Sequence, residues 1–223
     1  MENKVFVLDT HQLEDQKLFD KYCHRMRQTR RDRVERMRFP DGKRLVLGAG
    51  IITEKCLDYA GKPEAPITVT DAGKPTVDGL YFNISHTSHM VVGAVSDKEV
   101  GVDIEHIRSF DKPLLKRAFT ENERASAEEK KTRDAYFTRL WTIKESVMKW
   151  YGLGLSLDPG HIEITREDKD IRVSLIDKPE LPDPSLLHFT LYEHLGYLIT
   201  VCSCDFPFTS DITPLALTAD GVL

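Results

Sequence analysis

The segment VGVDIEHIR, residues 100–108, places two acidic side chains inside an otherwise apolar run, and this restricts how the run can fold. Its valine and isoleucine residues favour a buried β-strand. Because successive side chains of a strand point to opposite faces, Asp103 and Glu105 share one face, and Val102 and Ile104 share the other. Two unpaired carboxylates on one face repel each other. The acidic face is therefore either fully solvated, as on an ordinary edge strand, or bound to a cation.

A second group of charged residues lies in LWTIKESVMKWYGLG, residues 140–154, which has the pattern of a long helix closed by glycine. Glu145 and Lys149 are four residues apart and fall on the same side of this helix as Trp141, with Lys144 flanking that side. Taken alone, this is the pattern of a surface helix with an ion pair between Glu145 and Lys149, which contributes only about 0.3 kcal/mol.

Together, the two segments supply three carboxylates, those of Asp103, Glu105 and Glu145, that suit a hard divalent cation. Mg²⁺ prefers oxygen ligands and retained water, and substrate phosphates often complete its coordination shell. Residues 24–38 hold seven arginines and two acids, and this local positive excess favours a phosphorylated ligand although the net charge of the chain is −5. The sequence therefore predicts a Mg²⁺ site beside a phosphate site.

The composition narrows the class of protein. The chain has 223 residues, of which 40% are hydrophobic and 30% charged, as is typical of soluble globular proteins. Its negative net charge argues against nucleic-acid binding, and no run approaches the roughly 20 apolar residues of a membrane helix. The N-terminal MENKVFVLDT indicates a strand rather than a signal peptide. Cys23, Cys56, Cys202 and Cys204 form no zinc-binding spacing, so we expect a cytoplasmic protein.

Strand and helix patterns follow one another in two similar blocks. The expected strands lie within residues 4–9, 65–79, 80–97, 99–105, 161–167, 170–177, 187–196 and 197–206, and the expected helices within 12–38, 42–61, 112–129 and 133–152, with a break at 40–42. Residues 120–123 have the form of a helix capping box. The order predicts an α+β protein of two similar subdomains, residues 1–100 and 101–223, each with helices packed on a small, mostly antiparallel sheet. The tail, residues 209–223, carries no strong signal.

Five segments resemble motifs of the Sfp-type 4′-phosphopantetheinyl transferases. They are GKP at 73–75, FNISHT at 82–87, GVDIE at 101–105, RAFTENE at 117–123 and WTIKESVMKWYGLGL at 141–155. The resemblance implies a pseudo-dimer of two α+β halves with the active site between them. It implies transfer of the 4′-phosphopantetheine arm of coenzyme A to a serine of an apo carrier protein, with release of adenosine 3′,5′-bisphosphate. It also implies a monomer, because each half supplies what a smaller relative obtains from a neighbouring subunit.

The same resemblance assigns roles to the charged residues. Asp103, Glu105 and Glu145 would hold Mg²⁺, or Mn²⁺ in its place. Glu145 would activate the carrier serine, either directly or through a metal-bound water. Lys149 would contact the pyrophosphate and neutralise or protonate the leaving bisphosphate.

Further contacts to coenzyme A follow from the family motifs. Ser85 and His86 would contact phosphate groups, with His86 near the 3′-phosphate. Lys144 would contribute positive potential, and Lys74 and Arg44 would make additional contacts.

The phosphate-binding lysines that the family has upstream find no clean match in this chain. Arginine suits phosphate well, and the choice stays open among Arg30, Arg31, Arg33 and Arg38. His89, an extra histidine after the FNISHT segment, is interpreted as a turn residue.

Two other functions compete with the transferase. A catalytically silent binding module for coenzyme A or a carrier would lack one metal carboxylate or Lys149, and an unrelated Mg²⁺-dependent phosphohydrolase would leave FNISHT and GKP unexplained. Acyl, peptidyl and aryl carriers of the fatty-acid, polyketide, nonribosomal-peptide and lysine pathways are all open as partners. The resemblance implies carriers that are acidic and helical, so residues 107–123, with Lys112, Lys116 and Arg117, are the expected docking element.

Overall fold

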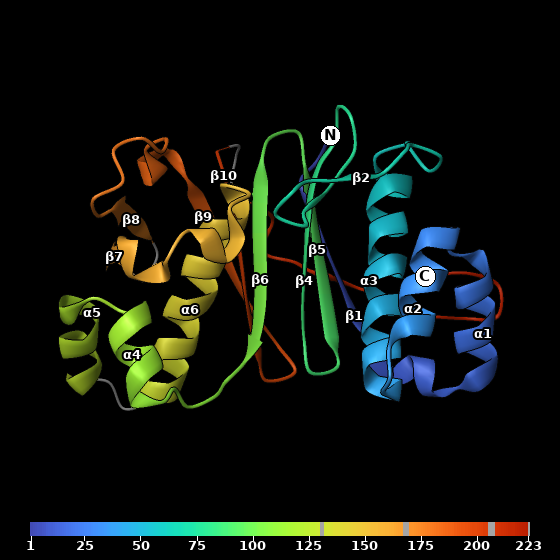
Figure 1. The fold of residues 1–223 in the computed structure, drawn as a ribbon, viewed down its shortest axis with the longest axis horizontal. Helices are drawn as coiled ribbons and strands as arrows, with labels where there is room; N and C mark the ends of the chain where they lie inside the picture. Colours follow the sequence, from blue (N-terminus) through green and yellow to red (C-terminus); the bar gives the residue numbers. More distant parts are fainter. Residues whose placement is uncertain (130–131, 167–169, 205–207, 223) are drawn as a thin grey trace.

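The computed structural model describes residues 1–129, 132–166, 170–204 and 208–222. In this part of the chain two main β-sheets lie side by side in the middle, and helices cover the outer side of each (Figure 1). The first sheet has the strand order β11-β1-β5-β4, and the second has the order β6-β10-β9. Neighbouring strands are antiparallel, except that β11 is parallel to β1. The prediction of an α+β fold with small, mostly antiparallel sheets is confirmed.

The first half of the chain builds the first sheet and its helices. Its elements are β1 (Lys4–Asp9), α1 (Gln16–Arg25), α2 (Gln28–Arg36), α3 (Pro40–Tyr59), β2 (Thr68–Val69), β3 (Pro75–Thr76), β4 (Tyr81–Thr87) and β5 (Met90–Ser96). The single helical stretch expected over 12–38 is interrupted, because Met26 and Arg27 separate α1 from α2. Pro40 does not break the chain as expected but begins α3, a position where its missing N–H costs no intrahelical bond.

The second half of the chain builds the second sheet and the helices on its outer side. Its elements are β6 (Val100–His106), α4 (Lys112–Ala118), α5 (Glu121–Ser126), α6 (Arg133–Trp150), β7 (Ile162–Arg166), β8 (Arg172–Leu175), β9 (His188–His194) and β10 (Tyr197–Ser203). The predicted capping box is present, since Thr120 and Glu123 exchange both of its hydrogen bonds at the start of α5. Gly152 follows the end of α6 with a φ of +70°, in the left-handed region that favours glycine.

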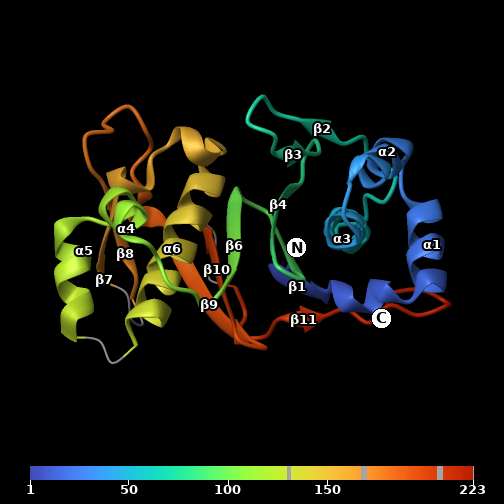
Figure 2. The ribbon, with the colours of Figure 1, turned by 60° about the horizontal axis from the view of Figure 1, so that its bottom comes forward.

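Three apolar clusters hold the described part of the chain together. One lies between the first sheet and helices α1–α3 and includes the fully buried Ile52. Another lies between the second sheet and helices α4–α6 and includes the fully buried Ile143. Figure 2 shows these helices on the two outer sides of the molecule. The third cluster joins the two sheets and includes Val92, Val102 and Val201. The halves are therefore fastened to each other by buried apolar surface.

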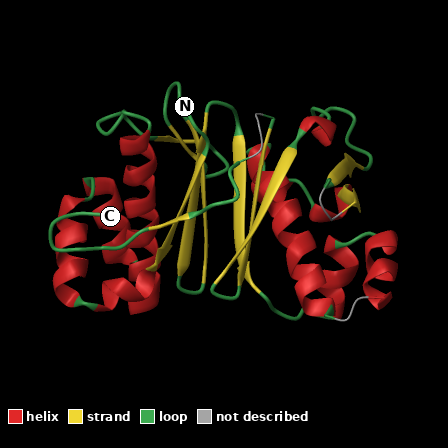
Figure 3. Cartoon of the chain, turned by 180° about the vertical axis from the view of Figure 1, so that it is seen from behind, coloured by secondary structure: helices red, strands yellow, loops and turns green. Residues whose placement is uncertain are grey.

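The C-terminal tail returns to the first half. Strand β11 (Thr213–Pro214) pairs with β1, and Leu215 and Leu217 enter the first apolar cluster. The Tyr22 hydroxyl donates to two carbonyl groups of the tail. Figure 3, which views the molecule from behind, shows the tail crossing in front of the sheets toward the helices of the first half. The division of the sequence into residues 1–100 and 101–223 places this tail in the second half, whereas in the structure the tail packs on the first half.

None of the helices in the described ranges has the length and apolarity needed to cross a membrane.

Candidate active site

Strands β4 and β6 are the facing edges of the two sheets, and side chains bridge them. Asn83 Oδ1 accepts from the Val102 N–H at 3.1 Å, Ser85 Oγ donates to Asp103 Oδ1 at 2.7 Å, and Thr87 Oγ1 donates to Glu105 Oε2 at 3.2 Å. Because alternate residues of β4 face the same way, all three bonds point toward β6. We call this contact the β4–β6 seam. It holds Asp103 and Glu105 on one side of β6, as the alternation of the sequence predicted.

Helix α6 packs closely against β6. A Cβ atom at position 101 would lie 1.9 Å from the carbonyl oxygen of Ser146, so glycine is required there. Gly101 therefore allows the backbone of the helix to approach the strand, one of the uses of glycine in proteins. This close approach brings Glu145 and Lys149 of α6 to the carboxylates of the seam.

Lys149 forms an ion pair at the centre of the seam. Its Nζ lies 2.6 Å from Asp103 Oδ1 and 2.7 Å from Ser85 Oγ. Asp103 is buried, with 5% of its surface exposed, and its Oδ2 has no hydrogen-bond partner among the described residues. The surface ion pair between Glu145 and Lys149 that one interpretation of the sequence favoured is thus replaced by a pair that joins helix to strand.

The other two carboxylates hold their protons more tightly than usual. The pKa of Glu145 is raised to about 7, chiefly by burial and also by the charges of Asp103 and Glu105, with Lys149 acting in the opposite direction. Burial also raises the pKa of Glu105, against the opposing charge of Arg108, whose Nε lies 3.6 Å from Oε2. The three carboxylates are close enough to repel one another. Even so, no three acidic, histidine or cysteine side chains in the described part of the chain form a ready metal cluster.

His86 lies on β4 next to Ser85 and is exposed on the opposite face of the strand. The surrounding protein atoms desolvate its ring and lower its pKa, and the charges of Lys149 and Arg33 lower it further. Arg33, on α2, is therefore near enough to act on His86. A phosphate in this place would meet positive charge from two helices.

The other candidate arginines are placed differently. Arg30 shares with Arg33 a pocket of about 450 Å³, whose far wall includes Gly73 and Pro75 of the GKP segment. Burial and the nearby charge of Arg33 lower the pKa of Arg30 to about 10. Arg31, by contrast, donates to the carbonyl of a residue on α1.

Arg38, Lys74 and Arg44 contact other protein groups in the structure. The guanidinium of Arg38 lies 5.7 Å from the centre of the Phe39 ring. Lys74 forms an ion pair with Glu99 and donates to the Lys149 carbonyl at 3.2 Å, which ties the β2–β3 hairpin to the end of α6. The structure places Arg44 at the start of α3, where it pairs with two acidic residues.

Comparison with known proteins decides between the competing functions. Residues 99–202 match the family model of the 4′-phosphopantetheinyl transferase superfamily. The chain is 33% identical to 4′-phosphopantetheinyl transferase ffp of Bacillus subtilis, over 78% of each chain. It is 34% identical to 4′-phosphopantetheinyl transferase Sfp of Bacillus subtilis strain 168, over 68% of this chain and 69% of that one. The chain belongs to the Sfp-type 4′-phosphopantetheinyl transferase family. The transferase moves phosphopantetheine to carrier proteins, and the phosphohydrolase alternative is set aside.

Solved structures give more distant matches. The transferase superposes on holo-[acyl-carrier-protein] synthase of Helicobacter pylori in complex with coenzyme A with a TM-score of 0.38 and 19% identity, over 47% of this chain and 97% of that one. The corresponding match to the synthase of Thermotoga maritima has a TM-score of 0.38 and 18% identity, over 47% of this chain and 61% of that one.

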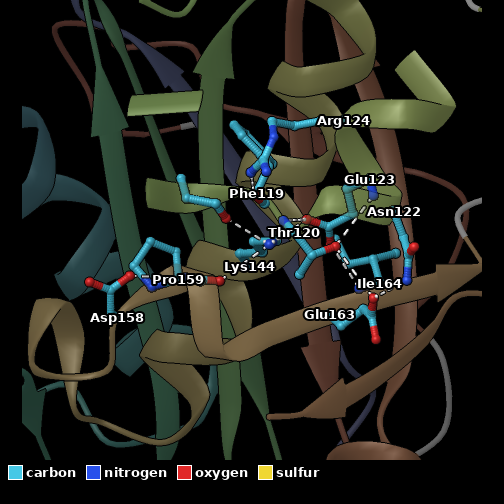
Figure 4. Close-up of polar contacts among 12 residues, drawn as sticks. Phe119, Thr120, Asn122, Glu123, Arg124, Lys144, Asp158, Pro159, Glu163 and Ile164 are labelled. Carbon is cyan, nitrogen blue, oxygen red and sulfur yellow. Dashed lines mark hydrogen bonds and ion pairs between the residues drawn. The ribbon is translucent and has the colours of Figure 1, made fainter. Parts of the chain in front are cut away.

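The structure corrects the role expected for Lys144. This side chain has no exposed surface and does not reach the seam of the transferase. Its Nζ lies 2.7 Å from Glu123 Oε2, on the side of α6 that faces α5 (Figure 4). Positions 144 and 149 are five residues apart and so point about 140° away from each other on a helix. The helical spacing in the sequence was thus sufficient to separate Lys144 from Lys149.

Sequence reasoning also missed residues that build the seam. Asn83 and Thr87 lie two residues on either side of Ser85, so the strand alternation of FNISHT could have placed them on the same face. Gly101 could have been read as a close approach of two backbones. Glu99, the partner of Lys74, had no sequence signal, because the pairing depends on how the hairpin folds back.

Proposed function

We propose that the transferase takes its phosphopantetheine arm from coenzyme A at the β4–β6 seam and releases adenosine 3′,5′-bisphosphate. Mg²⁺ or Mn²⁺ would be held there by Asp103, Glu105 and Glu145. The observation that carries the proposal is the convergence of these three carboxylates, from a strand and a helix, on a place that also contains Lys149 and Ser85.

The residues fit a hard divalent cation. Asp103 offers a buried Oδ2 without a hydrogen-bond partner in the described ranges, and burial and mutual repulsion raise the pKa values of Glu105 and Glu145. A bound divalent cation would relieve that repulsion and supply positive charge for the pyrophosphate oxygens.

The side chains of the seam can accept a proton from the carrier serine and stabilise the negative charge of the leaving group. The Glu145 carboxylate, whose pKa is raised to about 7 when no cation is bound, is the proposed general base for the carrier serine. The serine oxygen then forms a bond to the phosphorus next to the pantetheine, and the bond from that phosphorus to adenosine 3′,5′-bisphosphate breaks. The Lys149 ammonium, oriented by Ser85 and Asp103, stabilises the negative charge on the leaving bisphosphate.

Coenzyme A would extend from the seam toward α2. We place its 3′-phosphate near His86 and choose Arg33 among the four arginines, because its charge already acts on that ring. Arg30 lines the neighbouring pocket with the GKP segment, which suits the adenosine end. Lys74 and Arg44 remain proposed contacts, and a phosphate would have to exchange with their present acidic partners.

The carrier would dock on α4, whose Lys112, Lys116 and Arg117 are exposed. The two sheets with their own helices support a pseudo-dimer of two similar halves that acts as a monomer, which light scattering after gel filtration would test. We place the enzyme in the cytoplasm, where free cysteines such as Cys204 stay reduced.

One assay tests the metal and the donor together. The purified chain is incubated with coenzyme A, Mg²⁺ and an apo carrier protein, and the intact mass of the carrier is followed. We expect the mass of one phosphopantetheine to be added, an almost complete loss of this reaction in excess chelator, and at least a hundredfold loss in Asp103→Asn. Asp20→Asn, an exposed change on α1, should behave as wild type. Full activity in chelator would exclude the metal site.

A further inference from the structure

Lys144 is held by acceptors from three different elements. Its Nζ donates to the Ala118 carbonyl at 2.7 Å, to Glu123 Oε2 at 2.7 Å and to the Pro159 carbonyl at 3.2 Å (Figure 4). A lysine ammonium has three N–H donors, so each donor has one acceptor. The side chain is fully buried and its hydrogen bonding is complete.

The partner carboxylate is equally occupied. Glu123 Oε1 accepts from the Ile164 N–H at 2.8 Å, and Oε2 accepts from the Thr120 N–H at 2.8 Å as well as from Lys144. Its side chain has 1% of its surface exposed. A buried ion pair with all its hydrogen bonds made is weak evidence for stability, because desolvation offsets most of the attraction. What such a pair does provide is a fixed geometry.

The geometry fixed here is the attachment of α4 and α5 to α6. Ala118 is the last residue of α4, so its carbonyl is one of those that a helix leaves without an intrahelical partner. Glu123 closes the first turn of α5. Lys144 therefore fastens the corner between these two short helices to α6 at the residue next to Glu145.

We propose that the buried pair of Glu123 and Lys144 is a positioning device, which holds a carrier docked on α4 so that its serine meets Glu145. The inference rests on the proposed docking of the carrier on α4. Neither residue touches coenzyme A or the carrier. Both act through the position of α4 relative to the face of α6 that lies in the seam.

The decisive variant combines Lys144→Met with Glu123→Gln. It removes both charges at once and leaves a glutamine oxygen that can still accept from a backbone N–H. Its binding to a carrier whose serine is changed to alanine, its KM for coenzyme A and its kcat are measured well below its melting temperature. We expect carrier affinity and the KM for coenzyme A within twofold of wild type, and kcat at least tenfold lower.

If Glu123 and Lys144 only stabilised the fold, the folded double variant would keep the wild-type kcat. Ile52→Ala destabilises the first half, far from α4, and supplies a control with an equal or larger loss of stability. Its folded population should keep the wild-type kcat. Lys144→Met alone, which leaves the Glu123 charge buried and unpaired, should be less active than the double variant. If the double variant does not fold, Glu123→Gln alone keeps the other two acceptors of Lys144 and should lower kcat at least threefold.

A wild-type kcat in the folded double variant would overturn the inference. Charge reversal of Lys112 and Lys116 tests separately whether the carrier docks on α4. If that reversal leaves carrier binding unchanged, the docking proposal fails and the positioning device fails with it. If reversal weakens binding while the double variant keeps its kcat, only the positioning device is wrong.

Discussion

The Nζ atom of Lys149 lies 2.6 Å from Oδ1 of Asp103, and this ion pair joins α6 to β6. Ser85 completes the arrangement by donating to the same Oδ1 atom. Lys149 thereby offsets part of the negative charge of the three carboxylates, and in the proposed function it also contacts a phosphate of coenzyme A. Removing it should affect both charge balance and catalysis.

Lys149→Met should lower kcat at least a hundredfold, because the leaving bisphosphate would lose its nearest ammonium. The variant should also melt at a lower temperature than wild type at pH 8 without divalent cations, since the carboxylates lose their counter-ion. Added Mg²⁺ should restore much of that stability but not the activity. Activity within threefold of wild type would contradict the assignment.

The raised pKa of Glu145 predicts a pH dependence of stability. A carboxyl that binds its proton more tightly in the folded state contributes most below its unfolded pKa of 4.5, and this contribution is lost as the pH rises toward about 7. Glu145→Gln should therefore melt at a higher temperature than wild type at pH 8 and show little difference at pH 4.5. Melting curves without divalent cations would check this, and equal curves at pH 8 would exclude the repulsion.

Mg²⁺ should raise the folding stability that the repulsion among the carboxylates lowers at pH 8. A cation that binds only the folded state stabilises it, and the stabilisation grows with the cation concentration relative to its Kd. The melting temperature of the wild type at pH 8 should rise with Mg²⁺, and that of Glu145→Gln should rise much less.

The elements that carry the site were largely predictable, because each follows from a local pattern. The alternation in GVDIE placed Asp103 and Glu105 on one face, and the spacing in α6 placed Glu145 and Lys149 on one side. What a local pattern cannot show is a pairing between segments distant in the sequence. The return of the tail to β1 and the pairing of Lys74 with Glu99 are of this kind.

His86→Ala should weaken coenzyme A binding more than it slows saturated turnover, because its proposed contact is at the 3′-phosphate, away from the bond that breaks. The KM for coenzyme A should rise about tenfold and kcat should change less than threefold. Dephospho-coenzyme A, which lacks that phosphate, should show a smaller difference between variant and wild type. His89→Ala, on the same hairpin and stacked on the His11 ring, is the matched control. Equal effects with both coenzymes would exclude the 3′-phosphate assignment.

The last prediction concerns the surface of α4, which the structure divides into two parts. Phe119, just after the helix, is fully buried in the second apolar cluster, and Leu114 and Leu115 are partly buried against it. These three residues lie within the segment 107–123 that the sequence marked for docking, and they therefore serve the core wholly or in part. Lys112 and Lys116 remain exposed, so the docking surface must act chiefly through charge.

Lys112→Glu combined with Lys116→Glu should raise the KM for an acidic carrier at least tenfold at low salt and leave the KM for coenzyme A within twofold. Opposite charges steer the encounter of two proteins, and salt screens that attraction. Rising salt should therefore weaken carrier use by the wild type more than by the variant. Lys17→Glu with Lys98→Glu makes the same change of net charge at two other exposed lysines and should leave both KM values unchanged. A double variant on α4 that uses the carrier as well as wild type at low salt would place the docking surface elsewhere.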